Sequence, residues 1–202
     1  MRTDTDRKVP WNHPMLIALG AFLWACSWTI GVCVIDNLSR GFGWLLMGIA
    51  GGLATAAVVR RAQPDLDGVY SRVIVLGWAI GGVAAGGVAR FNILQGWIAM
   101  GIVGGAIMGA AVLKTSRSGV LAGITGPAAS WLFAGVVGAM FGSRGARAIG
   151  VRLGEMVPGE LQSFLVAGAI WAIAGGVTGA IGCGLTLWQL RRREKSGAFR
   201  TP

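Results

Sequence analysis

Charged residues are scarce in this sequence, and none lies near the centre of its long apolar runs. Asp, Glu, Lys and Arg make up 13% of the 202 residues, whereas hydrophobic residues make up 54%. So few charges do not cover the surface of a soluble domain of this size. An apolar run of about 20 residues is long enough for a helix to cross a bilayer. The sequence therefore predicts a multi-pass membrane protein.

The lack of ionisable residues at membrane depth also argues against several classes of function. Such residues mark proton relays, ion paths and counter-ions, so their absence argues against a proton-coupled transporter, a pump, an intramembrane protease or a metal enzyme. The chain contains no HExxH motif, P-loop or Rossmann fingerprint. A lipid enzyme would need a nucleophile beside a base, and the sequence offers none. We expect no enzyme activity, no catalytic residues and no metal site.

Cysteine and histidine are also rare. The three cysteines lie within apolar runs, which argues against a disulfide framework. His13 is the single histidine, and it is either a ligand for haem or chlorophyll or, as we favour, an interfacial polar residue. Gln95 is likewise a pigment ligand or a helix-end residue. With the deeper Trp131, these are the candidate ligand-binding residues. No cofactor is required, although bound lipid or pigment remains an open alternative.

The expected fold is an all-α, polytopic membrane protein with six transmembrane helices. The apolar runs lie at roughly 14–35, 41–59, 69–89, 93–113, 119–141 and 163–190. Residues 1–13 form a polar cytoplasmic segment, 14–190 the transmembrane domain, and 191–202 a basic cytoplasmic tail. Between the last two runs, Ala146, Ile149, Leu153 and Met156 recur at helical spacing. This spacing predicts a short amphipathic helix in the outer interface.

An internal repeat divides the transmembrane domain into three tandem hairpins, at 14–59, 69–113 and 119–190. The pattern Gly-Trp-x-x-Met-Gly-Ile-x-Gly-Gly begins at Gly43 and again at Gly96, an offset of 53 residues. The odd-numbered runs share a tryptophan at similar spacing, namely Trp24, Trp78 and Trp131. Trp44 and Trp97 suit the outer aromatic belt. The deeper tryptophans, Trp24, Trp131 and Trp171, are expected to fill space beside glycine, with contact to lipid, quinone or pigment as the alternative.

Glycine is very abundant, with 35 residues, and much of it recurs every four residues in the apolar runs. Small residues at this spacing let membrane helices pack closely. We expect flat glycine faces that also receive partner helices, built from Gly48, Gly52, Gly77, Gly81, Gly82, Gly86, Gly101, Gly105, Gly109, Gly175 and Gly179. Pro127 should free the Gly123 carbonyl and kink the fifth helix. We favour a packing kink over a substrate or ion path at this proline.

The basic residues predict the orientation. Of the 18 Lys and Arg, 13 lie on the same side as the N-terminus when six spans are drawn, and 5 lie on the other side. Basic residues collect on the cytoplasmic side, so both termini are expected in the cytoplasm of a bacterium. The membrane is the inner or an intracytoplasmic one. Because the bases sit at the ends of apolar runs, we expect lipid headgroups and not nucleic acid as their partners.

The Gln95-Gly96-Trp97 sequence and the repeated Gly-Gly pairs resemble a loose group of bacterial multi-pass membrane proteins built from tandem glycine-rich hairpins. The resemblance covers mostly the second to fourth runs. It implies a hairpin fold, and no catalytic residues can be carried over from it.

Two functions remain open from the sequence. The favoured one is a non-catalytic accessory or scaffold subunit of a larger, energy-converting membrane complex, which packs through glycine ridges, self-associates or binds other membrane subunits, and holds lipids or pigments in its grooves. The alternative is a channel or facilitator for a small neutral solute. A channel should show a continuous polar stripe along facing helices, whereas the Ser and Thr residues of the apolar runs are scattered.

Overall fold

The computed structural model describes residues 13–37, 40–64, 67–90, 93–112, 120–156 and 160–195. All regular structure within these residues is α-helical, and the order of the elements is α1 (His13–Asn37), α2 (Arg40–Ala62), α3 (Gly68–Val88), α4 (Ile93–Val112), α5 (Val120–Met156) and α6 (Glu160–Lys195). Each helix contains a stretch that is long and apolar enough to cross a membrane. The prediction of an all-helical chain with six candidate spans is therefore confirmed.

Local signals explain where α2 ends and α3 begins. Arg60 and Arg61 occupy the last turn of α2, where positive charge stabilises the negative end of the helix dipole. Asp67 caps α3, and its carboxylate accepts a hydrogen bond from the Val69 backbone N–H at 3.3 Å. These residues therefore turn the chain back within a few positions and place the two helices side by side.

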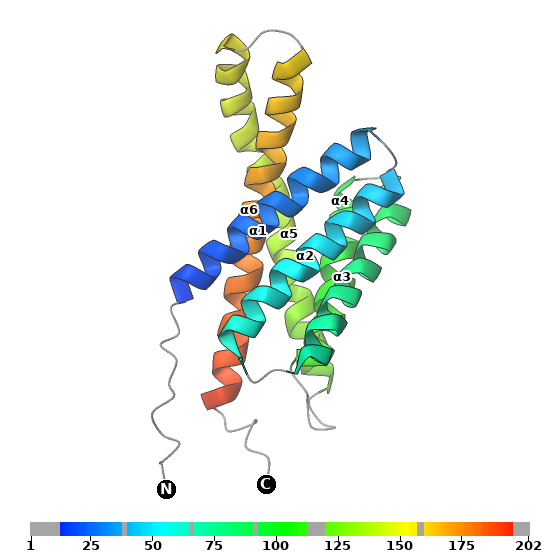
Figure 1. Cartoon of the computed structure of the whole chain (residues 1–202), viewed down its shortest axis with the longest axis vertical. Coiled ribbons are helices and arrows are strands. Elements are labelled where there is room, and N and C mark those ends of the chain that lie inside the picture. Colours follow the sequence, from blue (N-terminus) through cyan, green and yellow to red (C-terminus); the bar gives the residue numbers. More distant parts are fainter. Residues whose placement is uncertain are drawn as a thin grey trace, which may run out of the picture.

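The six helices form a closed ring. Each helix packs extensively against the next one in the chain, and α6 packs back against α1, while contacts across the ring are few (Figure 1). The start of α1, the turn between α2 and α3, and the end of α6 lie at the same end of the molecule (Figure 1). The side chains that point inward from the ring therefore build its core.

Two helices are longer than the others. α5 has 37 residues and α6 has 36, whereas α2, α3 and α4 have 20 to 23. Their joined ends project beyond the other four helices (Figure 1). The separate amphipathic helix expected in the outer interface is not confirmed, because residues 142–156 continue α5 without a break. The helical spacing in that segment belongs to an extension of the fifth span.

Candidate functional site

Glycine forms the contacts between neighbouring helices. All eleven glycines expected from the sequence to pack helices face another helix of this same chain. Gly48 on α2 lies directly against the Trp78 carbonyl of α3, and Gly82 on α3 lies against the Trp44 carbonyl of α2. A methyl group on either glycine would overlap backbone atoms. These ridges are therefore used inside the chain, so partner helices cannot also occupy them.

The same backbone contact recurs at three places around the ring. The carbonyl groups of Trp78, Trp131 and Trp24 face a glycine on the preceding helix of the ring, which is Gly48 on α2, Gly101 on α4 and Gly175 on α6 respectively. A second glycine follows one turn later on each of these helices, at Gly52, Gly105 and Gly179, and it also faces the neighbouring helix. The ring therefore repeats one close-packed interface three times.

The side chains of these three tryptophans meet at the centre of the ring. We call Trp24, Trp78 and Trp131 the central triad; all three are fully buried, with exposed fractions of 0% to 1%. The ring centroids lie 4.8 Å apart for Trp24 and Trp78, 4.6 Å for Trp78 and Trp131, and 5.0 Å for Trp24 and Trp131. The first two pairs are edge-to-face, a favourable arrangement for aromatic rings.

Each indole of the central triad lies over a glycine on the helix that follows its own. Trp24 covers Gly51, Trp78 covers Gly104 and Trp131 covers Gly182. A methyl group on Gly51 would lie 2.5 Å from Cη2 of Trp24, and one on Gly104 would lie 2.6 Å from Cε3 of Trp78. Glycine at these positions therefore makes the space that the large indoles occupy.

Threonine satisfies two of the three indole N–H groups. Nε1 of Trp24 donates to Oγ1 of Thr55 at 3.2 Å, and Nε1 of Trp131 donates to Oγ1 of Thr186 at 3.2 Å. Both hydroxyls donate in turn to a carbonyl one turn earlier in their own helix. Each threonine stands four residues after the glycine beneath the indole. This arrangement places a polar acceptor inside an otherwise apolar core.

The helix pair α3 and α4 lacks this acceptor. Four residues after Gly104 the chain has Met108 instead of threonine, and Met108 is buried. Nε1 of Trp78 is buried and has no hydrogen-bond partner among the described residues. The three tryptophan sites therefore have the same packing, but only those of Trp24 and Trp131 contain a hydroxyl acceptor.

Replacing Thr55 by valine should destabilise the ring. The isosteric change removes the acceptor and leaves the Trp24 N–H buried without a partner, which costs about 1–3 kcal/mol. Thr186→Val should act in the same way on Trp131. Thermal unfolding in mild detergent, followed by size-exclusion chromatography, measures the change.

Thr29→Val is the matched control, because among the described residues the Thr29 hydroxyl bonds only to the Ala25 carbonyl in its own helix. We expect it to be near neutral. If Thr29→Val lowered the unfolding temperature as much as Thr55→Val, the indole bond would not be the cause of the effect.

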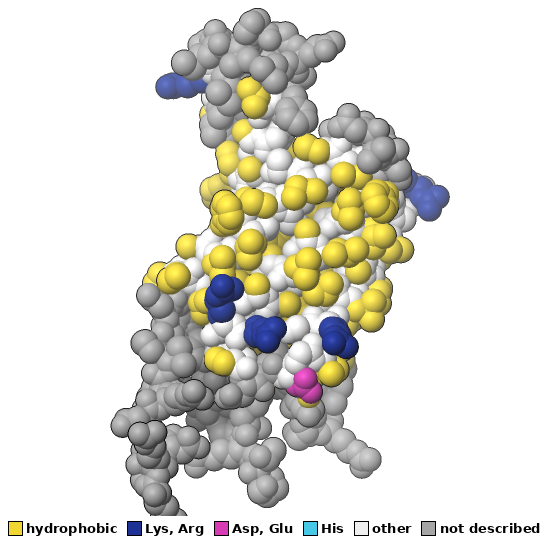
Figure 2. Space-filling model, viewed as in Figure 1, with side chains coloured by type: hydrophobic (Ala, Val, Ile, Leu, Met, Phe, Trp, Pro, Cys, Tyr) yellow, Lys and Arg dark blue, Asp and Glu magenta, His cyan; other side chains and the backbone are white. Residues whose placement is uncertain are grey.

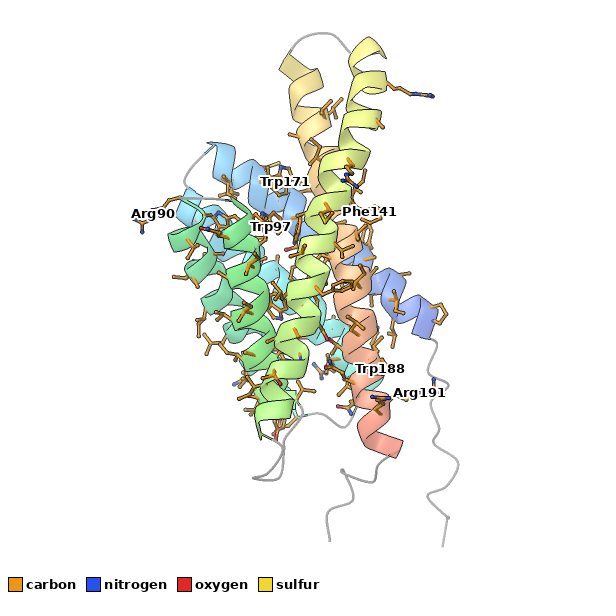
Figure 3. All side chains as sticks on the ribbon, turned by 180° about the vertical axis from the view of Figure 1, so that it is seen from behind. Arg90, Trp97, Phe141, Trp171, Trp188 and Arg191 are labelled. Atoms are coloured by element: carbon orange, nitrogen blue, oxygen red, sulfur yellow. The ribbon has the colours of Figure 1, made fainter. Side chains whose placement is uncertain are left out.

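A second aromatic layer lies next to the central triad. The rings of Trp97 and Trp171 stack at 5.0 Å with an interplanar angle of 9°, and Trp44 meets Trp97 edge-on at 5.4 Å. Trp97 comes from α4 and Trp171 from α6 (Figure 3). Trp44 and Trp97 are only 2% and 3% exposed. The prediction that both residues belong to the aromatic belt of the outer membrane interface is therefore wrong, because their side chains are buried inside the ring of helices.

Little space remains between the two aromatic layers. One cavity of about 10 Å³ is bordered by Trp24, Trp28, Trp78, Trp97 and Trp131, among others. This volume is close to the minimum that one water molecule needs. The cavity is therefore far too small for an organic substrate or a pigment.

The hydroxyl groups inside the ring are engaged within the chain. The Ser27 hydroxyl donates to the Met47 carbonyl at 2.9 Å, and the Thr178 hydroxyl on α6 also reaches the Ala134 carbonyl on α5 at 3.3 Å. Nε2 of Gln189 on α6 donates to the Ser130 hydroxyl on α5 at 2.9 Å. These groups tie neighbouring helices together and do not line an open path.

The three candidate ligand-binding residues are not brought together. His13 is the first residue of α1, and its side chain lies outside the described part of the structure. Gln95 is exposed at the start of α4, whereas Trp131 is fully buried in the central triad. Because α1 and α4 begin at opposite ends of the ring, these residues form no common site.

Pro127 lies buried inside α5, which continues as a helix on both sides of it. The carbonyl four residues earlier belongs to Gly123, and Gly109 on α4 packs directly against it. A methyl group on Gly109 would also lie 2.6 Å from Cγ of the proline ring. The proline is thus part of the α4–α5 packing contact.

The outer surface carries large apolar side chains and a few basic ones. Figure 2 shows a broad band of hydrophobic side chains, with Lys and Arg toward its two ends. Arg90 and Arg191 lie at opposite ends of the bundle (Figure 3). Between α2 and α3 this surface is hollowed into a groove of about 630 Å³. The groove is large enough for part of a lipid or another organic ligand.

Comparisons with protein-family models, with curated proteins and with solved structures find no match to this chain.

Sequence reasoning missed the partners of the buried indoles and the groove. Thr55 and Thr186 were visible only as scattered polar residues in apolar runs. Their placement four residues after a glycine was a usable signal, because a hydroxyl there faces the same side of the helix as the glycine. The groove had no sequence signal, since its shape depends on how α2 and α3 pack.

Proposed function

We propose that this chain is a non-catalytic accessory or scaffold subunit of a larger membrane complex. The observation that carries the proposal is the filled axis of the ring, where Trp24, Trp78 and Trp131 contact one another. Such an interior holds the helices in a fixed arrangement and leaves no room for a substrate. A rigid, apolar-sided body of this kind is suited to positioning neighbouring membrane subunits.

The outer side chains are the proposed contacts with partners. Since the glycine ridges are occupied within the chain, a partner helix must meet larger residues. Phe133 and Phe141 on α5 are 58% and 62% exposed, and Phe22 on α1 is 66% exposed. Lipid-facing aromatic side chains of this size also pack well against another helix. An assembly for energy conversion is the kind of complex in which we place the subunit, with pigments held by the partners or between them.

Purification from native membranes in mild detergent tests this proposal. A tagged chain should recover the same set of membrane proteins in repeated preparations, identified by mass spectrometry. An equally tagged, unrelated multi-pass protein is the control. Recovery of this chain alone, as a colourless particle, would overturn the proposal. Visible absorbance of the intact particle would identify an energy-converting assembly.

A channel for a small neutral solute is the second candidate. It is favoured by the closed ring of six helices around one axis, which is a suitable frame for a pore. A channel requires the side chains of the central triad, which fill this axis, to move apart when it opens. Purified protein in liposomes should then conduct water or glycerol above the rate of empty liposomes. An equal rate with and without protein would remove this candidate.

We further propose that the ring consists of three tandem hairpins with both termini in the cytoplasm. The threefold recurrence of the tryptophan–glycine contacts supports the hairpins, and the distribution of Lys and Arg supports the orientation. Reporter fusions at the C-terminus and at the connection between α1 and α2 test the orientation. Cytoplasmic activity of the reporter at the connection would contradict it.

A further inference from the structure

The groove between α2 and α3 has an apolar wall that opens toward the outside of the ring. Its wall includes Ile49 and Leu53 from α2 with Val75, Leu76 and Ala79 from α3. Leu53 and Leu76 are 57% and 60% exposed, so they form the outer edges. Small residues deepen the groove, because alanines stand where larger side chains would fill it. This surface faces the region that the lipid chains occupy.

One end of the groove is basic. Arg60 from the last turn of α2 and Arg72 from the beginning of α3 both border it. Both arginines are exposed, and neither forms an ion pair with a carboxylate among the described residues. The Asp67 carboxylate nearby is engaged in capping α3. Two guanidinium groups at one end of a groove are therefore available to an anion from outside.

A hydroxyl lies beside the two arginines. Ser71 borders the groove, and its Oγ atom is buried without a hydrogen-bond partner among the described residues. Buried polar atoms in native structures normally have a partner. A phosphate oxygen would accept a hydrogen bond from this hydroxyl as well as from the guanidinium groups.

We propose that this groove binds one anionic glycerophospholipid. Its phosphate lies between Arg60 and Arg72, and one acyl chain extends along the apolar wall toward Ile49. Arginine recognises phosphate through paired hydrogen bonds, and basic pockets between membrane helices bind acidic headgroups. The 11 helical steps of α2 from Ile49 to Arg60 rise about 16.5 Å. That length matches one leaflet, which is half of a hydrocarbon core of about 30 Å.

The apolar wall selects a lipid over a free anion. Inorganic phosphate would meet only the arginine end, and most of the groove would stay empty. The acyl chain of a zwitterionic lipid fits the apolar wall equally well, but the positively charged part of its headgroup would lie close to the arginines. The combination of two arginines and a long apolar wall therefore fits an anionic lipid best. The site extends the proposed function, because it names a lipid that the subunit would carry.

Native mass spectrometry of the purified chain in mild detergent tests the site. Phosphatidylglycerol should bind more strongly than phosphatidylcholine with the same acyl chains. Arg60→Gln and Arg72→Gln should each weaken phosphatidylglycerol binding by roughly fivefold, as expected for one arginine at an anionic headgroup. The neighbouring Arg61, which does not border the groove, is the matched control. Arg61→Gln should leave the binding unchanged.

A second variant separates lipid from free anion. Ala79→Phe fills the apolar wall without changing charge, so it should reduce binding of phosphatidylglycerol and spare any binding of inorganic phosphate. Size-exclusion profiles of all variants establish that they fold. Equal binding of the two lipids, or an equal loss in Arg61→Gln, would overturn the proposal. Binding that Ala79→Phe leaves intact would likewise exclude the acyl chain from the groove. Because the chain is tested without partners, failure here is distinct from failure of the subunit proposal.

Discussion

Gly48→Ala is expected to destabilise the protein by about 3 kcal/mol, because the added methyl group meets backbone and not a side chain that can move. A Cβ atom at this position would overlap the Trp78 carbonyl and approach the Gly82 Cα atom to 3.2 Å. The two helices must then separate, which also loosens the indole of Trp78 above Gly104. Thermal unfolding in mild detergent measures the loss, and Gly82→Ala should act alike from the opposite side.

Gly87→Ala is the control on the same helix as Gly82. Nothing lies within 4 Å of a Cβ atom placed on Gly87. Alanine is also favoured over glycine inside a helix by about 1 kcal/mol. The variant should therefore unfold at the same or a slightly higher temperature than the parent chain. A similar loss in Gly87→Ala and Gly48→Ala would mean that helix propensity, and not close packing, governs these positions.

Trp131→Ala is expected to have the largest effect of any single substitution. It removes a fully buried indole that contacts Trp24 and Trp78, and it leaves the Thr186 hydroxyl without its donor. Substitutions of this kind cost about 3–5 kcal/mol through lost burial and the remaining cavity. The unfolding temperature should fall sharply, and added indole should restore part of it, because apolar cavities bind aromatic molecules.

Trp188→Ala is the matched control for the central triad. Trp188 is 50% exposed near the end of α6, where the Arg192 guanidinium lies 4.3 Å from its ring centroid. An exposed cation–π contact contributes about 0.5–1 kcal/mol, so the loss should be small. A loss as large as that of Trp131→Ala, or no rescue of Trp131→Ala by indole, would show that the triad does not hold the ring together.

The helices themselves were predictable from the sequence. Crossing a membrane requires length and apolarity, and both are local properties that can be read along the chain. The expected spans therefore agree with the observed helices to within a few residues, except in α5 and α6. There the chain between Phe141 and Met156 has helical spacing, and spacing alone does not tell a separate interfacial helix from a continuation of the same one.

The internal repeat was also recognisable in the sequence, but the contacts between its tryptophans were not. The match that begins at Gly43 and Gly96 and the shared tryptophans of the odd-numbered runs are sequence features. That Trp24, Trp78 and Trp131 touch one another depends on α6 returning to α1, a contact between segments more than 120 residues apart. No local pattern encodes such a closure.

What the sequence by itself determined is the number and approximate extent of the apolar helices, and the positions of the glycines that let them approach. The tertiary structure alone decided which way each helix faces. A rotation by a fraction of a turn decides whether a side chain such as that of Trp97 points to the membrane interface or into the core. It likewise decides whether a glycine such as Gly48 contacts a helix of the same chain or is available to a partner. It also decided that Arg60 and Arg72 border one groove, because a groove is the space that two packed helices leave between their side chains.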